Sequence, residues 1–261
     1  MVRKLETNMT HIIAVLNQKG GVGKTTTTIN LATYLARAGK SVLVVDLDPQ
    51  GNATSGLGID KQGIKTGTYE VLLGKKSLDA AIVPVPDEEN VYLLPTGQSL
   101  AAAELELVDL SEREFSLKKA LSKSGHDYVL IDCPPALSLL TVNALTAATS
   151  LLIPVQSEYY ALEGLTQLLE VTQQVRQGLN PHLELLGVLL TMYDARTSLS
   201  EQVKGEVAQY FGDKVFETVI PRNVRLAEAP SHGRSIAAYD KWSKGARAYK
   251  QLAKEVGKRL G

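Results

Sequence analysis

One stretch of the chain decides the fold: Lys19-Gly20-Gly21-Val22-Gly23-Lys24-Thr25-Thr26. It follows a short apolar run, His11 to Leu16, and it opens a segment of helical spacing, Lys24 to Ala38. Glycines allow a tight turn whose backbone N–H groups point inward at an anion, and the helix that follows adds its positive dipole end. This order of strand, glycine-rich turn, Lys-Thr and helix predicts a loop that binds the phosphates of ATP.

Two side chains of the loop are expected to carry the chemistry. Lys24 would bridge the β- and γ-phosphates, and the Thr25 hydroxyl would ligate Mg²⁺, an ion that keeps some waters and takes phosphate oxygens as ligands. The alternative is an ordinary glycine-rich turn between a strand and a helix, which would not need the Lys-Thr pair. The predicted ATP contacts in the loop are Lys19, Gly20, Gly21, Val22, Gly23, Lys24, Thr25 and Thr26.

Short apolar runs alternate with longer segments of helical spacing along the whole chain. Several runs are rich in Val, Ile and Leu without polar alternation, which is typical of strands buried on both faces. The alternation predicts a single-domain, doubly wound α/β fold, with a mostly parallel sheet and helices on both faces. The expected strands are His11–Leu16, Ser41–Asp46, Val91–Leu94, Tyr128–Ile131, Leu151–Val155, Leu185–Thr191 and Thr218–Ile220. The expected helices are Lys24–Ala38, Glu112–Lys123, Ser138–Ala148, Leu162–Arg176, Leu199–Tyr210 and Ser243–Arg259, and Pro84–Asn90 is expected to be an exposed loop.

Length and composition favour one globular domain. The 261 residues include 44% hydrophobic and 21% charged residues, close to the average for proteins that bury a core. We expect residues 1–10 to be a flexible extension and residues 11–261 to form the domain. The single cysteine, Cys133, favours a reducing cytoplasm, and no run approaches the ~20 apolar residues of a membrane span.

The charge is divided unevenly along the chain. Residues 1–195 carry 15 Lys and Arg against 21 Asp and Glu, whereas residues 196–261 carry 13 against 7. This asymmetry predicts a basic surface that faces an anionic partner, although a solvated helical face at the C-terminus would have the same composition.

Lys19 is not explained by the loop alone. It lies five residues before Lys24, where it cannot easily curl onto its own nucleotide, but it could reach a nucleotide held by a facing subunit. The complete pattern KGGxGKT[ST] resembles the deviant Walker A ATPases, in which this first lysine acts across an ATP-sandwich dimer. The alternative is a solvent-exposed loop lysine.

The same resemblance gives roles to carboxylates at two further strand ends. Val44–Asn52 looks like the first switch of the family, and Asp48 matches the carboxylate that positions the attacking water and the metal shell. Val129–Pro135 resembles a Walker B segment, so that Asp132 would hold Mg²⁺ through water. Phosphoryl transfer needs mostly positioning and charge neutralisation, which suits such carboxylates. Asp46 is the alternative to Asp48, and a capping role is the alternative for Asp132.

The resemblance is closest to ParA/Soj-type partition ATPases and runs from about His11 to about Leu260. The matching stretches are Asp46–Gly58, Leu130–Leu145, Leu189–Thr197 and Ile220–Gly233. It implies a Mg²⁺-dependent ATPase that pairs as an ATP-bound homodimer and binds double-stranded DNA without reading its sequence. It also implies stimulation by a ParB-type centromere-binding protein and a cytoplasmic, nucleoid-associated location.

The resemblance also implies contacts outside the loop. Pro221 and Asn223 match the segment that wraps the adenine, and Arg196 and Arg225 match DNA-binding positions. Further candidates near them in the sequence are Arg222, Arg234, Lys241, Lys244 and Arg247. As a group these side chains suit phosphate neutralisation, whereas for any one of the five alone a solvated surface residue is the slightly better explanation.

Other classes of protein share parts of this pattern. A MinD-like, membrane-recruited division-site ATPase would end in an amphipathic membrane helix, but a core-facing helix explains the last apolar stripe better. That stripe consists of Tyr249, Leu252, Ala253, Val256 and Leu260. An iron–sulfur ATPase would need four thiolates, and one cysteine per chain supplies two in a dimer. An ATP-dependent ligase would be stimulated by a substrate other than DNA, and a DNA-binding protein without ATPase activity would not need Lys24, Thr25, Asp48 and Asp132.

Overall fold

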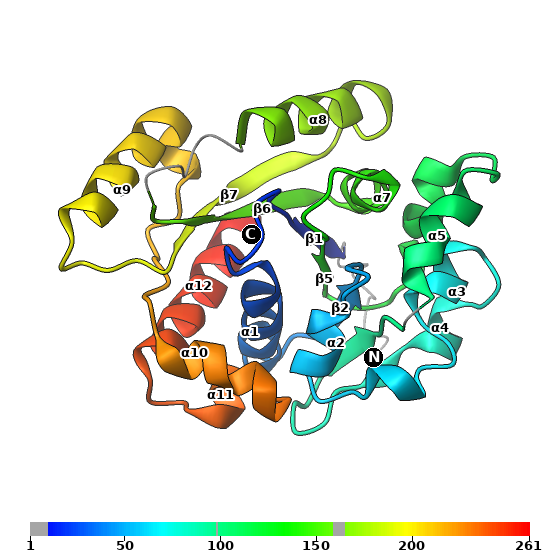
Figure 1. Cartoon of the computed structure of the whole chain (residues 1–261), viewed down its shortest axis with the longest axis horizontal. Helices are drawn as coiled ribbons and strands as arrows, with labels where there is room; N and C mark the ends of the chain where they lie inside the picture. Colours follow the sequence, from blue (N-terminus) through cyan, green and yellow to red (C-terminus); the bar gives the residue numbers. More distant parts are fainter. Residues whose placement is uncertain (1–9, 98, 159–164) are drawn as a thin grey trace, which may run out of the picture.

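The computed structural model describes residues 10–97, 99–158 and 165–261. Within them, seven strands form one sheet in the order β3-β4-β2-β5-β1-β6-β7 (Figure 1). All neighbours are parallel except β3 and β4. The strands are β1 His11–Val15, β2 Val42–Asp46, β3 Val83–Pro84, β4 Val91–Leu94, β5 Tyr128–Asp132, β6 Ser150–Gln156 and β7 Glu184–Thr191. The predicted doubly wound, mostly parallel α/β fold is confirmed.

Helices connect the strands and complete the C-terminal region. The first six are α1 Lys24–Arg37, α2 Asn52–Gly56, α3 Thr68–Leu72, α4 Leu78–Ala81, α5 Leu100–Leu107 and α6 Ser116–Leu121. The others are α7 Leu139–Ala147, α8 Leu165–Gly178, α9 Ser198–Phe211, α10 Val224–Glu228, α11 Ile236–Tyr239 and α12 Lys244–Leu260. Short 3₁₀ turns occur at η1 Lys61–Gly63, η2 Arg113–Phe115, η3 Gly212–Lys214 and η4 Ala229–His232.

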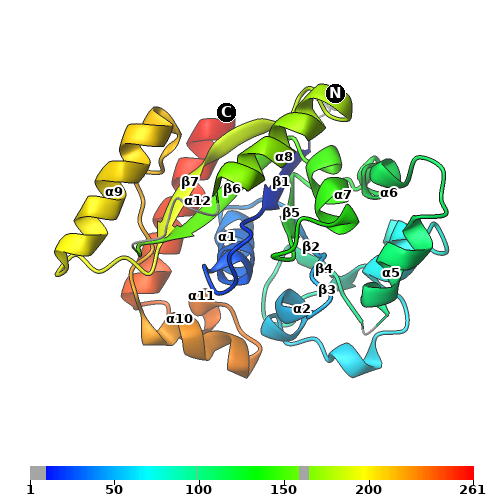
Figure 2. The ribbon, with the colours of Figure 1, turned by 45° about the horizontal axis from the view of Figure 1, so that its top comes forward.

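The sheet is covered on both faces. Helices α1 and α12 lie side by side against one face, and α7 and α8 cover the other (Figures 1 and 2). Along β1, Ile13 and Val15 join the core on the α1 side, while Ala14 joins the core on the α7 side. Burial of alternate residues on opposite faces is the reason that the strands read as continuous apolar runs.

Two of the expected elements are wrong. Thr218–Ile220 is not a strand, because the carboxylate of Glu255 accepts the N–H groups of Glu217 and Thr218 at 2.9 and 3.0 Å. Two isolated bridges flank the segment, and the N–H of Ile220 donates to the carbonyl oxygen of Leu190 on β7 at 2.8 Å, but no continuous ladder forms. The expected helix Glu112–Lys123 is divided into η2 and α6, because the backbone of Phe115 at their junction (φ −102°, ψ 2°) departs from helical values. Glu112 lies before both elements with a left-handed φ of 56°.

The loop Pro84–Asn90 is less exposed than expected. Val85 and Glu88 are buried, and Glu88 forms an ion pair with Arg37 at 3.3 Å. The first residues of the expected helix Leu162–Arg176, and residues 1–9 of the expected extension, lie outside the described residues.

The topology places a binding site beside β1. From β1 the chain crosses through α1 to β2 on one side, and from β5 it crosses through α7 to β6 on the other side. The direction of winding therefore reverses next to β1, and ligands of such sheets bind outside the carboxyl ends of the strands at this point. The Lys19–Thr26 loop leaves β1 at that edge.

Candidate nucleotide site

The loop after β1 has the backbone that its glycines predict. Gly21 and Gly23 have φ values of 73° and 90°, in the left-handed region that favours glycine, and Gly23 caps α1. Lys24 is buried, and its Nζ donates a hydrogen bond to the carbonyl oxygen of Lys19 at 3.2 Å. Burial lowers the pKa of Lys24, while Asp132 opposes that shift. The ammonium is thus folded back over the loop, where an anion would meet it.

One side chain of the loop and one side chain from β7 fix the loop. Asn17 Nδ2 donates to the carbonyl oxygen of Pro154 on β6 at 2.7 Å, and Thr191 Oγ1 on β7 donates to that of Val22 at 2.8 Å. A loop held in this way pays little ordering entropy when it binds an anion.

Thr25 and Asp132 meet at the start of α1 and the end of β5. Thr25 Oγ1 donates to Asp132 Oδ2 at 2.7 Å, and Asp132 is fully buried. Burial raises the pKa of Asp132, and the nearby carboxylate of Asp46 raises it further. A hydroxyl oxygen with a carboxylate behind it is the kind of oxygen donor set that suits Mg²⁺, so the residues present fit that ion.

Asp46 and Asp48 lie in different environments. Asp46 is fully buried, and its Oδ2 accepts the N–H and the hydroxyl of Thr54 at 2.7 and 2.6 Å. Burial raises the pKa of Asp46 to about 6. Among the described residues, the Asp48 carboxylate accepts only the backbone N–H of Gln50, at 2.9 Å. Asp46 therefore anchors the segment that leads into α2, whereas Asp48 keeps capacity for a ligand.

A cavity of about 350 Å³ adjoins the loop. It brings Pro221 and Asn223 next to Gly23 and Thr26, almost 200 positions earlier in the sequence. Its lining also includes residues that the sequence did not indicate as functional, among them Met192, Leu226 and Tyr249. Leu226 and Tyr249 have the pattern of core positions, and Met192 is marked only by a positive φ of 51°, which the sequence does not reveal.

Lys19 points away from its own phosphate loop. Its Nζ lies 3.2 Å from Glu158 Oε2 beyond the end of β6, and both side chains are 44% exposed. An ion pair as exposed as this one contributes little stability, so an incoming anion could replace Glu158 at small cost.

The two arginines expected at a DNA surface are exposed and bound to carboxylates of the same chain. Arg196 forms a bidentate ion pair with Asp194, in which Nε donates to Oδ1 at 2.9 Å and Nη2 donates to Oδ2 at 2.7 Å. Arg225 lies 2.9 Å from Glu228 and 3.7 Å from Asp240. The five further candidates are also exposed, on the segment that holds α10, α11 and the start of α12: Arg222, Arg234, Lys241, Lys244 and Arg247. Of these, Arg222 also lines the cavity beside the loop.

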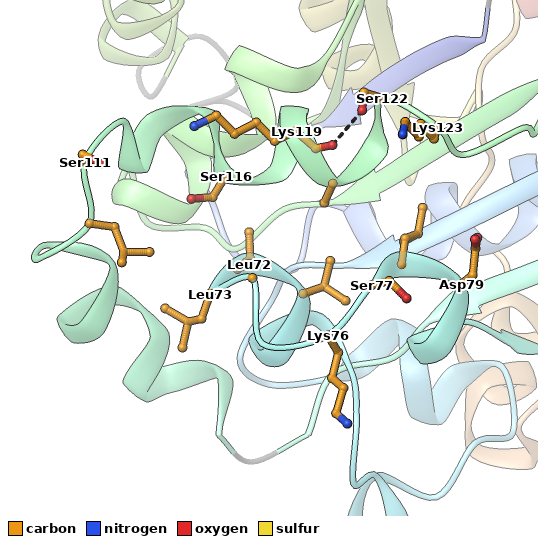
Figure 3. A pocket seen from close by; sticks show the side chains of 15 residues that line it. Leu72, Leu73, Lys76, Ser77, Asp79, Ser111, Ser116, Lys119, Ser122 and Lys123 are labelled. Atoms are coloured by element: carbon orange, nitrogen blue, oxygen red, sulfur yellow. Dashed lines mark hydrogen bonds between the residues drawn. The ribbon is translucent and has the colours of Figure 1, made fainter.

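A larger cavity of about 630 Å³ lies between the α3–α4 segment and α6 (Figure 3). Lys76, Ser77 and Asp79 line it from one side, and Ser116 and Lys119 from the other. None of the site residues predicted from the sequence lines this cavity, so it is separate from the chemistry of the loop.

The fold and the site together define a P-loop nucleoside triphosphatase. Residues 10–185 match the family described as AAA domain. The sporulation initiation inhibitor protein Soj of Bacillus subtilis is 56% identical over 250 residues, which cover 95% of this chain and 98% of that protein. The chromosome-partitioning ATPase Soj of Thermus thermophilus is 55% identical over 95% of this chain and 96% of its own length.

A solved structure shares the fold at lower identity. It is the ADP- and magnesium-bound crystal structure of a cobyrinic acid a,c-diamide synthase from Mycobacterium smegmatis, with a TM-score of 0.83 and 42% identity. The similarity covers 94% of this chain and 93% of that one. On the whole-length identity to the Soj proteins, the chain belongs to the Soj/ParA family of chromosome-partitioning ATPases.

The pairing of Asp46 with Thr54 predicts a pH-dependent cost for Thr54→Val. The raised pKa of Asp46 means that its ionisation lowers the free energy of unfolding as the pH rises from about 4 to about 6. Loss of the Thr54 hydroxyl raises that pKa further, because the hydrogen bond favours the charged form, and it leaves the N–H of Thr96 without its acceptor. Urea unfolding should show a loss of about 1–3 kcal/mol at pH 8 and a smaller loss at pH 5. Thr54→Ser, which keeps the hydroxyl, is the matched control, and equal losses for Thr54→Val at both pH values would contradict the pairing.

Proposed function

We propose that the chain is an ATP-driven DNA-partition switch. ATP and Mg²⁺ bind at the Lys19–Thr26 loop, two chains pair face to face across the nucleotides, and the dimer holds duplex DNA until hydrolysis resets it. The proposal rests mainly on one observation: two lysines of one loop have different orientations. Lys24 is folded back onto the loop, whereas Lys19 extends away from it to an exposed carboxylate.

The geometry supports a nucleotide role for each predicted residue. Backbone N–H groups of the glycine-rich turn and the ammonium of Lys24 would hold the phosphates, and Thr25 with Asp132 behind it would hold the metal ion. The ion would neutralise charge on the transferred phosphoryl group. The cavity lined by Pro221 and Asn223 is apolar enough for the flat face of adenine, and it opens next to Thr26.

Asp48 is the carboxylate best suited to the chemical step. It lies close enough to Asp132 and Lys24 for its charge to act on both, and Gln50 is the only donor it has among the described residues. It would orient the attacking water, an interaction that is worth most in the transition state. Asp46 is already committed to Thr54 and is not proposed for this role.

A DNA partner is supported by the charge of the C-terminal region. The basic side chains around α10 and α12 are exposed, and long flexible cations of this kind give affinity for phosphates without sequence reading. Intramolecular carboxylates hold Arg196 and Arg225, so DNA would have to displace Asp194 and Glu228. We include a ParB-type protein as the partner that stimulates hydrolysis, on the strength of the family alone.

The MinD-like alternative receives less support. Among the helices of the described residues, none is long and apolar enough to cross a bilayer. Four of the five residues of the predicted apolar stripe on α12 are buried in the protein core, namely Tyr249, Leu252, Ala253 and Val256. The apolar side of the last helix is therefore engaged in packing, as expected for a core-facing helix.

Lys19→Ala should separate nucleotide binding from pairing. The variant should bind a slowly hydrolysed ATP analogue about as well as the wild type, because Lys24 and the loop amides are unchanged. It should remain monomeric in light scattering with the analogue and Mg²⁺, since the phosphate that Lys19 meets belongs to the other chain. Lys76→Ala, at another exposed lysine, should dimerise normally. Equal dimerisation of Lys19→Ala and wild type would reduce Lys19 to a loop lysine.

Arg225→Ala should reduce the salt dependence of duplex binding. We would introduce it into Asp48→Ala, which should bind ATP and pair but not turn over. Because a dimer loses two arginines, the slope of log affinity against log salt should fall by roughly two units if each meets one phosphate.

The complementary change Glu228→Gln should have the opposite effect on duplex affinity. It removes the closer of the two ion pairs of Arg225 and leaves the longer one with Asp240, so duplex affinity should rise. Filter binding on two unrelated duplexes measures both variants, and an unchanged slope for Arg225→Ala, or a loss confined to one duplex, would count against a sequence-neutral phosphate contact.

A further inference from the structure

Trp242 is the only tryptophan of the chain, and it is exposed. Its exposed fraction is 79%, and it lies in the turn between α11 and α12. Lys241 places its Nζ 5.3 Å from the centroid of the indole ring. Tryptophan is highly buried on average, so an indole open to solvent with a cation beside it marks a surface for contact.

The indole borders a groove of about 460 Å³ between the C-terminal end of α1 and α12. The described residues that line this groove include four cations and no carboxylate: Arg37, Lys241, Lys250 and Lys254. Arg37 is held by Glu88, but for the three lysines no carboxylate lies within ion-pair distance among the described residues. The groove is therefore positively charged and has an aromatic wall.

The position of the groove separates it from the nucleotide and joins it to the proposed DNA surface. It lies at the opposite end of the 14-residue α1 from Lys24, which is about 20 Å along the helix. A ligand in it would not compete with ATP. On its other side, Asp240 precedes Lys241 and lies 3.7 Å from Arg225.

We propose that this groove is a second nucleic-acid contact, in which duplex DNA that passes over Arg225 continues across α12. Phosphates of the backbone lie against Lys250 and Lys254, and the indole of Trp242 packs on the adjoining deoxyribose and base edges. Cations that neutralise backbone phosphates supply most of the sequence-neutral affinity for duplex DNA, and an indole beside them adds apolar contact. The inference rests on the proposed function, because it extends the proposed DNA surface to Lys250, Lys254 and Trp242.

The single tryptophan makes the test direct. The protein is loaded with a slowly hydrolysed ATP analogue and Mg²⁺ and titrated with a 24-base-pair duplex, while acrylamide quenching of tryptophan emission is followed. Quenching should fall several-fold as duplex binds, because Trp242 becomes covered. Trp242→Ala should weaken duplex binding about five- to tenfold.

Two further variants separate the groove from general charge. Lys250→Ala combined with Lys254→Ala should lower the slope of log affinity against log salt by about two units per groove. Lys258 is an exposed lysine of the same helix that does not line the groove, so Lys258→Ala should leave duplex affinity and tryptophan quenching near the wild-type values.

The outcomes distinguish this inference from the proposed function. If wild type binds the duplex but quenching of Trp242 and the affinity of the groove variants do not change, the groove contact is wrong and the proposed function stands. If wild type binds no duplex in any nucleotide state, the proposed function fails, and this inference fails with it. Protection of Trp242 by vesicles of phosphatidylglycerol and phosphatidylcholine, without protection by duplex, would overturn the groove contact in favour of a lipid surface.

Discussion

The structure depends on the placement of one buried ammonium among buried carboxylates. Lys24 lies at the start of α1, close to Asp132 at the end of β5, and Asp46 lies at the end of the adjacent strand β2. Burying charges is costly unless they are paired and hydrogen-bonded, which accounts for the hydroxyls of Thr25 and Thr54 in this region. Phosphate and Mg²⁺ would add opposite charges to the same small volume. The site is therefore electrostatically prepared for these ligands.

The same cluster connects the nucleotide site to the basic C-terminal region. Asp46 holds Thr54 on α2, and the turn that follows α2 packs directly on the turn before α11. At that contact a Cβ on Gly233 would lie 2.7 Å from the Cα of Gly58, so both positions need glycine. The segment that carries Asp48 and the segment that carries Arg225 are therefore in close packing. Interiors packed this densely transmit small displacements, which would give hydrolysis a physical route to the proposed DNA surface.

Much of the fold and of the candidate nucleotide site could be predicted from the sequence, because the patterns that define them are local. The loop, α1 and six of the seven expected strands follow from glycine placement and uninterrupted apolar runs. Helix α5 was not predicted, because its apolar residues do not mark a single buried face. Leu100 and Leu107 are buried, while Leu105 is exposed. The cavity beside the loop was only partly predictable, since Tyr249 and Leu226 look like any core residue until the fold brings them to Thr26. Ion pairs such as Lys19 with Glu158 depend on side-chain directions that spacing does not fix.

The central claim is that the nucleotide controls both pairing and DNA binding. Sedimentation velocity of the wild-type chain with a labelled duplex tests it most directly, with ATP and Mg²⁺, with ADP and Mg²⁺, and without nucleotide. The account predicts that the duplex sediments with a species of twice the chain mass only in the presence of ATP and Mg²⁺. Equal binding of the duplex with ADP, or binding by the monomer in the presence of ATP, would contradict it.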